Sequence, residues 1–412
     1  MIAAAIIGNP DNIMCKSWNI IRQIYGDCSR GPGNADFSAI SAVTSSKHEL
    51  ETHLNGMAEG TDVSELMLSV IIPNHNYDDY VGIAIKSALE IQWPKVEVIV
   101  VDDGSTDNSL QVIGAFSDKI TLISQENVGQ MPSCVNGFGK SSGDVVIFLD
   151  SDDALHPDVM NEIAAVWSQA ASKFQFQMRV IDAKGNPTGN ILPQFFLHPS
   201  PQNIREWMAT TGAYPTPPGS GNAYPRWLVE RIFNFKSDFT DRAPDSYLLA
   251  GAPACGDVIT IAKPLVDYRV HGLNHGAFLE LDDSRFAREI DVSRRRHKFF
   301  TEVARTEGLA VAAEALNRNF SYLCLRTASH TLRPDIHPVA GDRSIRILVD
   351  GCRAFSYPQG LSASQRASLL LWIVCVLLCP RSLQRMLVTW RYASAQRPKW
   401  IRHLLNRLRV VR

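Results

Sequence analysis

Three carboxylates follow directly after a short apolar run near the middle of the chain. Residues 145–149 read Val-Val-Ile-Phe-Leu, and Asp150, Asp152 and Asp153 come next. An uninterrupted apolar run of this kind predicts a strand that is buried on both faces of a parallel sheet. Crowded carboxylates repel one another and are costly to bury, so folding alone does not explain three of them. A divalent cation that also binds phosphate oxygens would relieve this repulsion.

A second group of acids follows another apolar run. Residues 96–101 are mostly apolar, and Asp102 and Asp103 come directly after them, in a segment that continues to Asp107. In a plainer interpretation, the acids of both groups form solvated turns or cap the following helices, and we prefer that interpretation for Asp107. A helix cap needs a single acid, however, whereas the first group has three.

The elements that would position these acids alternate along the chain. Apolar runs at residues 68–72, 96–101, 120–124 and 145–149 predict four strands, and apolar stripes with helical spacing lie between them. This order predicts a parallel, doubly wound α/β sheet. Ligands of such sheets bind beyond the carboxyl ends of the strands, which is where both groups of acids would lie.

Four segments of residues 66–275 resemble the family 2 glycosyltransferases, which have the GT-A fold. The segments are Ser69-Val-Ile-Ile-Pro-Asn-His-Asn-Tyr77, Val101-Asp-Asp-Gly-Ser-Thr-Asp107, Glu126-Asn127 with Asn136-Gly137, and Phe148-Leu-Asp-Ser-Asp-Asp153. Their order and separations are specific for the fold and for the class of cofactor, but they say little about the sugar. The resemblance implies a GT-A domain with a doubly wound, mostly parallel sheet, which we expect to be followed by a C-terminal helical extension.

The resemblance also implies a nucleotide site at the ends of the first strands. Pro73 and the loop after it, including Asn76, would lie under the nucleotide base. Asp103 would accept a hydrogen bond from the base, most naturally the imide of uracil, with Asp102 nearby, because an ionised carboxylate is the strongest acceptor for a buried N–H donor. Asn136 would contact the nucleotide-sugar, although the arginine that many members carry just before this asparagine is absent here.

For the three central acids, the resemblance implies that Asp150 and Asp152 hold Mn²⁺ or Mg²⁺ on the diphosphate of the donor, with Asp153 as an alternative ligand. Asp150 would thereby take part in binding the nucleotide-sugar as well. The metal would neutralise charge on the departing nucleoside diphosphate. His271, in the segment Tyr268-Arg-Val-His-Gly-Leu-Asn274, would complete the metal shell or bind the diphosphate, and a plain hydrogen-bonding role is equally open.

Two more residues and one loop would complete the site. Arg269 would offer a forked contact to phosphate, or it would pair with an acid in the core. Asp245 would be the base that deprotonates the acceptor hydroxyl in an inverting displacement, although Pro244 stands where many members carry a glutamate, and Asp245 could also cap a helix. Residues 214–223 contain too much proline and glycine for regular structure, so we expect a linker or a mobile loop on the acceptor side.

The ends of the chain differ from its middle. We expect residues 1–65 to be a weakly ordered leader without a signal peptide, residues 66–280 the catalytic domain and residues 281–360 a helical extension. In residues 361–412, an apolar run of about a dozen residues precedes nine basic residues and no acidic ones. Because about 20 apolar residues are needed to cross a membrane, we expect an interfacial, re-entrant or buried helix followed by a tail on an anionic membrane surface.

The charge and the cysteine content restrict which binding partners and which cellular compartment we expect. The net charge is −1, but the chain without its last 32 residues carries about −10. Such an acidic body would repel nucleic acid, so we expect no nucleic-acid partner, and docking to another protein stays an alternative role for the tail. The eight cysteines form no CxxC pair, which favours a reducing compartment. We therefore expect a cytoplasmic protein that associates peripherally with the inner face of the plasma membrane.

The combined prediction is a metal-dependent, inverting glycosyltransferase that moves a sugar from a nucleotide-sugar, with UDP the expected carrier, to a hydroxyl of a glycan or lipid-linked glycan in surface polysaccharide assembly. A catalytically silent binding or scaffold subunit of the same fold is the alternative. A nucleotidylyltransferase is disfavoured because no glycine-rich segment with arginine and lysine follows the first strand. A dehydrogenase is disfavoured because no GxGxxG follows residues 68–72.

Overall fold

The computed structural model describes residues 62–195, 198–235, 244–271 and 281–393, together with residues 396 and 398. All of them belong to the second of the two units of the chain, Asp62–Arg412. The expected leader therefore lies outside the described residues except at its end, where Asp62 caps the short 3₁₀ helix η1 (Val63–Glu65). Most of the expected basic tail, from residue 399 onward, lies outside them too.

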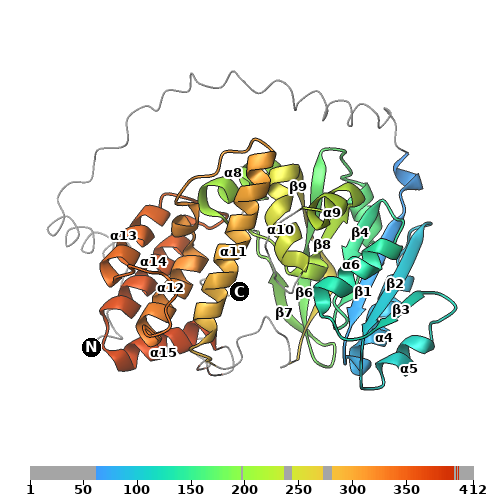
Figure 1. The fold of residues 1–412 in the computed structure, drawn as a ribbon, viewed down its shortest axis with the longest axis horizontal. Helices are drawn as coiled ribbons and strands as arrows, with labels where there is room; N and C mark the ends of the chain where they lie inside the picture. Colours follow the sequence, from blue (N-terminus) through green and yellow to red (C-terminus); the bar gives the residue numbers. More distant parts are fainter. Residues whose placement is uncertain are drawn as a thin grey trace. The chain divides into compact units, whose positions relative to one another are not determined.

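Four neighbouring strands of the sheet are parallel and lie in the order β3-β2-β1-β4. In chain order they are β1 (Leu68–Asn74), β2 (Val96–Asp103), β3 (Thr121–Gln125) and β4 (Val145–Phe148). The helices between them are α4 (Asp78–Leu89), α5 (Ser109–Gly114) and α6 (Gln130–Lys140). The alternation of strands and helices predicted from the sequence is therefore confirmed (Figure 1).

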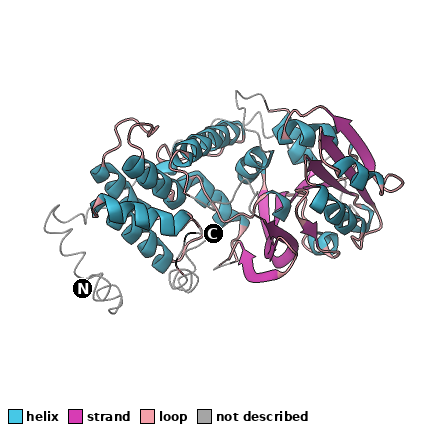
Figure 2. Cartoon of the chain, turned by 90° about the horizontal axis from the view of Figure 1, so that it is seen from below, coloured by secondary structure: helices cyan, strands magenta, loops and turns pink. Residues whose placement is uncertain are grey.

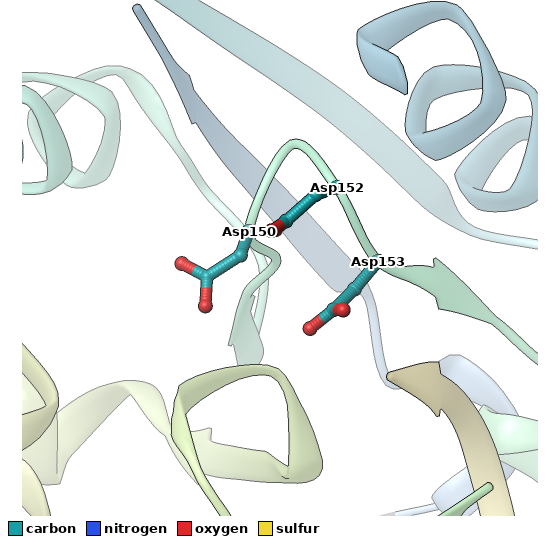
Figure 3. Close-up of side chains that lie close together, drawn as sticks. All are labelled: Asp150, Asp152 and Asp153. Atoms are coloured by element: carbon teal, nitrogen blue, oxygen red, sulfur yellow. The ribbon is translucent and has the colours of Figure 1, made fainter. Parts of the chain in front are cut away.

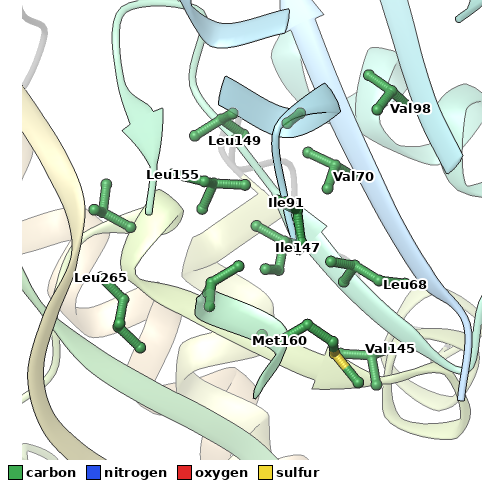
Figure 4. Packing of buried hydrophobic residues seen from close by; sticks show 14 of the residues in the cluster. Leu68, Val70, Ile91, Val98, Val145, Ile147, Leu149, Leu155, Met160 and Leu265 are labelled. Atoms are coloured by element: carbon green, nitrogen blue, oxygen red, sulfur yellow. The ribbon is translucent and has the colours of Figure 1, made fainter. Parts of the chain in front are cut away.

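The central strands are buried on both faces, which explains their uninterrupted apolar sequences. Leu68 and Val70 of β1 pack with Ile147 of β4 and with α4 in one core (Figure 4). Ile71 belongs to a second core on the opposite face, which α6 covers. A Cβ atom on Gly137 would lie 2.5 Å from Ile71 Cγ2, so this glycine lets α6 approach β1 closely.

The remaining half of the sheet mixes parallel and antiparallel pairs. β8 (Asn222–Pro225) lies antiparallel between β4 and β6 (Ala171–Asp182). β9 (Asp257–Val270) runs parallel to β6 and also pairs with the short β5 (Ala154–Leu155). β7 (Pro187–Leu192) forms an antiparallel hairpin with β6. The three aspartates after β4 lie where the parallel half of the sheet meets β8.

The prediction that residues 214–223 lack regular structure holds for residues 214–218 and is wrong for residues 219–223. The segment contains the 3₁₀ turn η2 (Gly219–Gly221) and enters β8, which lies in the middle of the sheet. The Asn222 side-chain amide donates to the carbonyls of Pro218 and Gly219 at 2.9 and 3.1 Å. A polar side chain thus supplies hydrogen bonds that the proline nitrogens cannot donate.

Helices from later in the chain cover the second core. They are α8 (Pro201–Thr211), α9 (Arg226–Phe233) and α10 (Pro244–Cys255), and they share this core with Val146 and Phe148 of β4. The short α7 (Val159–Ala164) contributes to the first core instead. Because α10 and β4 share one core, the position of α10 is coupled to that of the strand that immediately precedes the three aspartates.

The C-terminal part of the described chain is helical, as expected from the sequence (Figure 2). Its elements are α11 (Arg285–Thr306), η3 (Ala315–Arg318), α12 (Phe320–Leu332), α13 (Ser344–Ala354), α14 (Ala363–Leu378) and α15 (Arg381–Tyr392). The Arg326 guanidinium lies buried among these helices and forms ion pairs with Asp342 and Asp350. A buried cation therefore joins α12 to α13 and to the connection before it.

The apolar run near the C-terminus lies in α14. Leu369 and Ile373 are buried and pack with Phe320 of α12, so one side of this helix belongs to the core of the helical part. On another side, Leu371 and Leu378 are 52% and 70% exposed. None of the helices in the described part of the chain has both the length and the apolar character needed to cross a bilayer.

Candidate active site

The three aspartates that follow β4 lie together on the turn leading to β5 (Figure 3). One carboxylate oxygen from each lies within 4.8 Å of the other two. Within the described ranges, no other set of three or more His, Cys, Asp or Glu side chains has the spacing of a metal site. The structure thus brings together Asp150, Asp152 and Asp153 in an arrangement that could bind one divalent cation.

Asp153 lies deepest of the three, with 1% of its surface exposed. Its Oδ1 atom accepts a hydrogen bond from the Arg269 amide at 3.0 Å. Its Oδ2 atom is buried and has no hydrogen-bond partner among the described residues. Burial and the charges of Asp152 and Asp150 raise the pKa of Asp153 well above its usual value, an effect that the nearby Ser220 hydroxyl and the Arg269 amide only partly offset. An unsatisfied buried oxygen beside two more carboxylates fits a cation ligand.

Side chains from other parts of the chain orient the remaining two carboxylates. The Gln130 amide, at the start of α6, donates to Asp150 Oδ1 at 2.9 Å. The Asp150 backbone N–H donates to Ser220 Oγ in η2 at 3.1 Å. His271 Nε2 lies 2.9 Å from Asp152 Oδ2, so the histidine lies beside the three aspartates and contacts one of them. The structure shows a hydrogen-bonding contact for His271, and its roles toward the metal or the diphosphate stay predictions.

Aromatic rings from the start of α4 and the loop before it pack against the end of β9. The Tyr80 ring stacks on the His271 imidazole with centroids 4.9 Å apart, and the Arg269 guanidinium lies 5.0 Å from the Tyr80 ring centre. Tyr77 contacts the same imidazole edge-on at 5.8 Å. Burial and the charges of Asp152 and the other two aspartates raise the pKa of Tyr77 to about 12, so its hydroxyl stays protonated beside them.

Arg269 is buried, and two of its side-chain nitrogens contact backbone carbonyls. Its Nε atom donates to the Asp152 carbonyl at 2.9 Å, and its Nη1 atom donates to the carbonyls of Asp182 and Ala183 at 3.4 Å. These contacts hold the aspartate turn against the end of β6. Its predicted forked contact with phosphate stays a prediction.

Asp102 and Asp103 lie buried at the end of β2, and both already accept several hydrogen bonds. Asp102 accepts from the Asn74 amide at 3.0 Å and from the Ser105 hydroxyl at 2.6 Å. Asp103 accepts from the Val128 and Gly129 amides at 2.9 and 2.8 Å, and from a side chain of β3. Burial alone would raise the pKa of Asp103, but these hydrogen bonds lower it below the usual value. Asp103 is therefore an ionised acceptor.

The other residues expected at the nucleotide lie around this carboxylate. The Gln125 side chain bridges Asp103 and Asn136: it donates to Asp103 at 2.7 Å and accepts from Asn136 at 2.6 Å. Asn76 is exposed, has a φ of +59°, and accepts from the Thr106 amide at 2.7 Å. The Pro73 carbonyl accepts from Ser151, which links the first loop to the aspartate turn. The structure thus places all the expected nucleotide contacts at one edge of the sheet.

Asp245 lies in the first turn of α10, as its second residue. Its side chain lies outside the described part of the structure, so its assignment as catalytic base stays a prediction. The next residue, Ser246, is buried and accepts two hydrogen bonds from Arg296 of α11, at 3.0 and 2.6 Å. The start of α10 is thereby fastened to the helical extension.

Two residues that contact the aspartates, Ser220 and Gln130, were not predicted from the sequence. Ser220 lies 70 positions beyond Asp150 in a segment without periodicity, and Gln130 lies 20 positions before it. The glycine before Gln130, with a φ of +98°, was the available signal, since it marks the point where α6 begins beside the site.

Comparison with known proteins identifies relatives of the central part of the chain. The family model described as glycosyl transferase family 2 matches residues 69–233. An uncharacterized glycosyltransferase of Nostoc sp. is 32% identical over 219 residues, which are 51% of this chain and 66% of the relative. TarS of Staphylococcus aureus, a poly(ribitol-phosphate) β-N-acetylglucosaminyltransferase, is 30% identical over 133 residues, 30% of this chain and 22% of TarS. The chain thus spans slightly less than two thirds of the first relative and about a fifth of the second.

Two solved structures align with most of this chain at low similarity. TarS residues 1–349 in complex with UDP-GlcNAc align with a TM-score of 0.47 and 17% identity, over 79% of this chain and 90% of that chain. The mannosyltransferase PcManGT of Pyrobaculum calidifontis in complex with GDP-Man and Mn²⁺ aligns with a TM-score of 0.43 and 16% identity, over 82% and 90%.

Proposed function

The chain belongs to the family 2 glycosyltransferases through residues 69–233, and from that premise we propose that it is a metal-dependent, inverting enzyme. It moves a sugar from a UDP-linked donor to a hydroxyl group of a glycan or lipid-linked glycan. The observation that carries this proposal is the group of three carboxylates after β4, one of which has a buried oxygen without a hydrogen-bond partner among the residues that the structure describes.

In this proposal Asp150, Asp152 and Asp153 hold Mn²⁺ or Mg²⁺, and His271 either completes the metal shell or orients Asp152. The bound ion supplies Lewis-acid stabilisation of the negative charge on the departing diphosphate. The protein keeps the carboxylates in position through the hydrogen bond from Gln130 and the hydrogen bonds of the turn.

The donor base lies beside Asp103. This carboxylate accepts two hydrogen bonds on Oδ1 and one on Oδ2, and as an ionised acceptor it would also accept the N–H of a uracil ring. Pro73 lies near the end of β1 and Asn76 on the loop that follows this strand, and Asn136 shares the hydrogen-bonded partner Gln125 with Asp103.

Asp245 acts as the general base for the acceptor hydroxyl. An inverting displacement needs a base on the face opposite the leaving group, within hydrogen-bond reach of the attacking oxygen. The position of Asp245 in the first turn of α10, which shares its core with β4, supports this assignment. The relative TarS, named for transfer to poly(ribitol-phosphate), supports a polymeric acceptor.

We also propose that the protein lies on the inner face of the plasma membrane. Leu371 and Leu378 of α14 are exposed, and basic residues follow from Arg381 onward. Exposed apolar side chains next to cations suit a surface of anionic lipid.

Binding and turnover measurements test the proposed function together. Thermal shifts with UDP, GDP and their sugar conjugates should show stabilisation by UDP that requires Mn²⁺ or Mg²⁺. Slow metal-dependent hydrolysis of the preferred donor should accompany binding. Binding without any hydrolysis or transfer would favour the silent binding subunit, and a response to none of the nucleotides would contradict the proposal.

A further inference from the structure

A lysine lies fully buried next to the proposed active site. Lys173 of β6 has no exposed surface, and its Nζ atom donates three hydrogen bonds. The acceptors are Tyr214 Oη at 2.9 Å, Thr216 Oγ1 at 2.8 Å and Asn222 Oδ1 at 3.1 Å. Nζ also lies 4.8 Å from the centre of the Tyr214 ring. All three acceptors are neutral oxygens.

The three acceptors can each accept one of the three hydrogens of a charged ammonium group. Tyr214 donates its own hydrogen to the Leu249 carbonyl at 2.8 Å, so its oxygen accepts from Lys173. The Asn222 carbonyl oxygen can only accept. Burial lowers the pKa of Lys173 well below its usual value, so this arrangement is costly. A methionine of similar volume would fill the space without that cost, which indicates that the role of the lysine lies in its three hydrogen bonds.

The three acceptors all belong to residues 214–222, the segment that carries Ser220. Prolines at three of its positions cannot donate backbone hydrogen bonds, so side chains hold it instead. Lys173 donates to Asn222, and Asn222 in turn donates to the carbonyls of Pro218 and Gly219, at the start of η2. Ser220, within η2, accepts the N–H of Asp150. A chain of polar contacts thus leads from Lys173 to the first of the three aspartates.

A second chain of contacts leads from the same lysine to α10. Tyr214 joins Lys173 to the Leu249 carbonyl in that helix, and Asp245 lies one turn earlier in it. Hydrogen bonds therefore connect Lys173 both to the aspartate turn and to the helix that carries the proposed base.

We propose that Lys173 is a positioning residue for glycosyl transfer, which fixes residues 214–222 and thereby holds the aspartate turn and α10 in their relative places. This inference rests on the proposed function above, because it assigns Lys173 to the same site. Lys173 itself contacts neither donor nor metal.

The test compares Lys173→Met with Lys263→Met, the same substitution at an exposed lysine of β9 that pairs with Glu162. We expect Lys173→Met to weaken Mn²⁺ binding in the presence of UDP by about 10-fold, the lower end of the usual effect of residues that support metal ligands. It should lower kcat as well. The amide of Asp150 should exchange its hydrogen faster in the metal-free protein, because its acceptor Ser220 loses its support. Lys263→Met should leave all three measurements at the wild-type value.

Two milder variants keep the test decisive if Lys173→Met does not fold. Thr216→Val removes one acceptor and should change the same three measurements in the same direction, by a smaller amount. Tyr214→Phe also cuts the contact with Leu249, so it should lower kcat more than it weakens Mn²⁺ binding.

Wild-type Mn²⁺ affinity, kcat and Asp150 exchange in a folded Lys173→Met protein, or in both milder variants, would overturn the inference. A wild-type protein without Mn²⁺-dependent UDP binding would refute the proposed function instead. The exchange of the Asp150 amide would then still decide whether Lys173 positions the turn.

Discussion

His271 Nε2 lies 2.9 Å from Asp152 Oδ2, although 119 positions separate the two residues in the sequence. The contact joins the end of β9 to the turn after β4. The side chain and amide of Arg269, two positions earlier, reach Asp152 and Asp153 in the same place. The three aspartates are therefore held from both sides, by the strand that carries them and by one that enters the sheet much later.

Asp152→Asn should abolish Mn²⁺-dependent UDP binding and leave the fold intact. The substitution removes one of the three negative charges but keeps the size of the side chain. Titration calorimetry with UDP, with and without Mn²⁺, measures the effect. Asp158→Asn is the control, since Asp158 is a nearby aspartate in the sequence that does not belong to the group of three. Unchanged UDP affinity in Asp152→Asn would refute the metal assignment.

Asp245→Asn should bind the donor as well as wild type does, yet transfer sugar about 10²–10⁴-fold more slowly. An amide cannot accept the proton of the acceptor hydroxyl, but it leaves the donor site untouched. Initial rates with a saturating donor and a soluble acceptor analogue measure the loss. A rate within a few-fold of wild type would show that the base lies elsewhere.

The helical extension should lose stability in acid because of Asp342. Burial alone would raise the pKa of this carboxyl, but hydrogen bonds from His337 and Arg326 hold it at about 2. Since this lies below the usual value of 3.8, the ionised carboxylate stabilises the fold above about pH 4, and that contribution disappears as the pH falls toward 2.

Urea unfolding at pH 5 and at pH 2.5 measures this contribution in wild type and in Asp342→Asn. Wild type should be the more stable at pH 5, and the difference between the two proteins should shrink by about 2 kcal/mol at the lower pH. Glu314→Gln, which removes an exposed ion pair with Arg353, should show little change in the difference. A constant difference for Asp342→Asn would mean that its carboxylate is not specifically stabilised.

Membrane association should have two separable parts. Wild type should float with anionic vesicles in a density gradient, and more weakly with neutral ones. Removal of residues 394–412 should weaken the salt-sensitive part, because it removes six of the nine basic residues and each one near an anionic surface contributes about 1 kcal/mol. Leu371→Gln combined with Leu378→Gln should weaken the part that survives high salt, because both side chains are exposed. Wild-type protein that stays at the bottom with anionic vesicles would contradict the proposal.

Local patterns in the sequence predicted the parallel half of the sheet well. β4 is wholly apolar, and β1 and β2 contain long apolar runs, because both faces of these strands are buried, and such runs are visible without a structure. The same patterns failed for β8, because its four residues follow a proline-rich segment and are stabilised by partners far away in the chain.

The acids of the site could be found from the sequence, but their partners could not. Asp103 was expected to bind a base, and nothing nearby in the sequence showed that residues 125–129 already donate to it. Lys173 looked like one residue among many at the start of a strand. Its burial follows from the fold of residues 214–222 over it, a contact across about 40 positions that no periodicity reveals.

The insertion of β8 beside β4 has a consequence for the order of events during folding. Ile147 pairs with Ala223, so the edge of the nascent parallel sheet stays open until residues 222–225 have been synthesised. Closing a loop of more than 70 residues is entropically slow, and an open apolar edge is prone to self-association in the meantime. Nascent chains that end between β4 and β8 should therefore depend most on chaperones. Because β9 also holds the turn around Asp150, arrested ribosome complexes of increasing length should show protease resistance there only once β9 has left the exit tunnel.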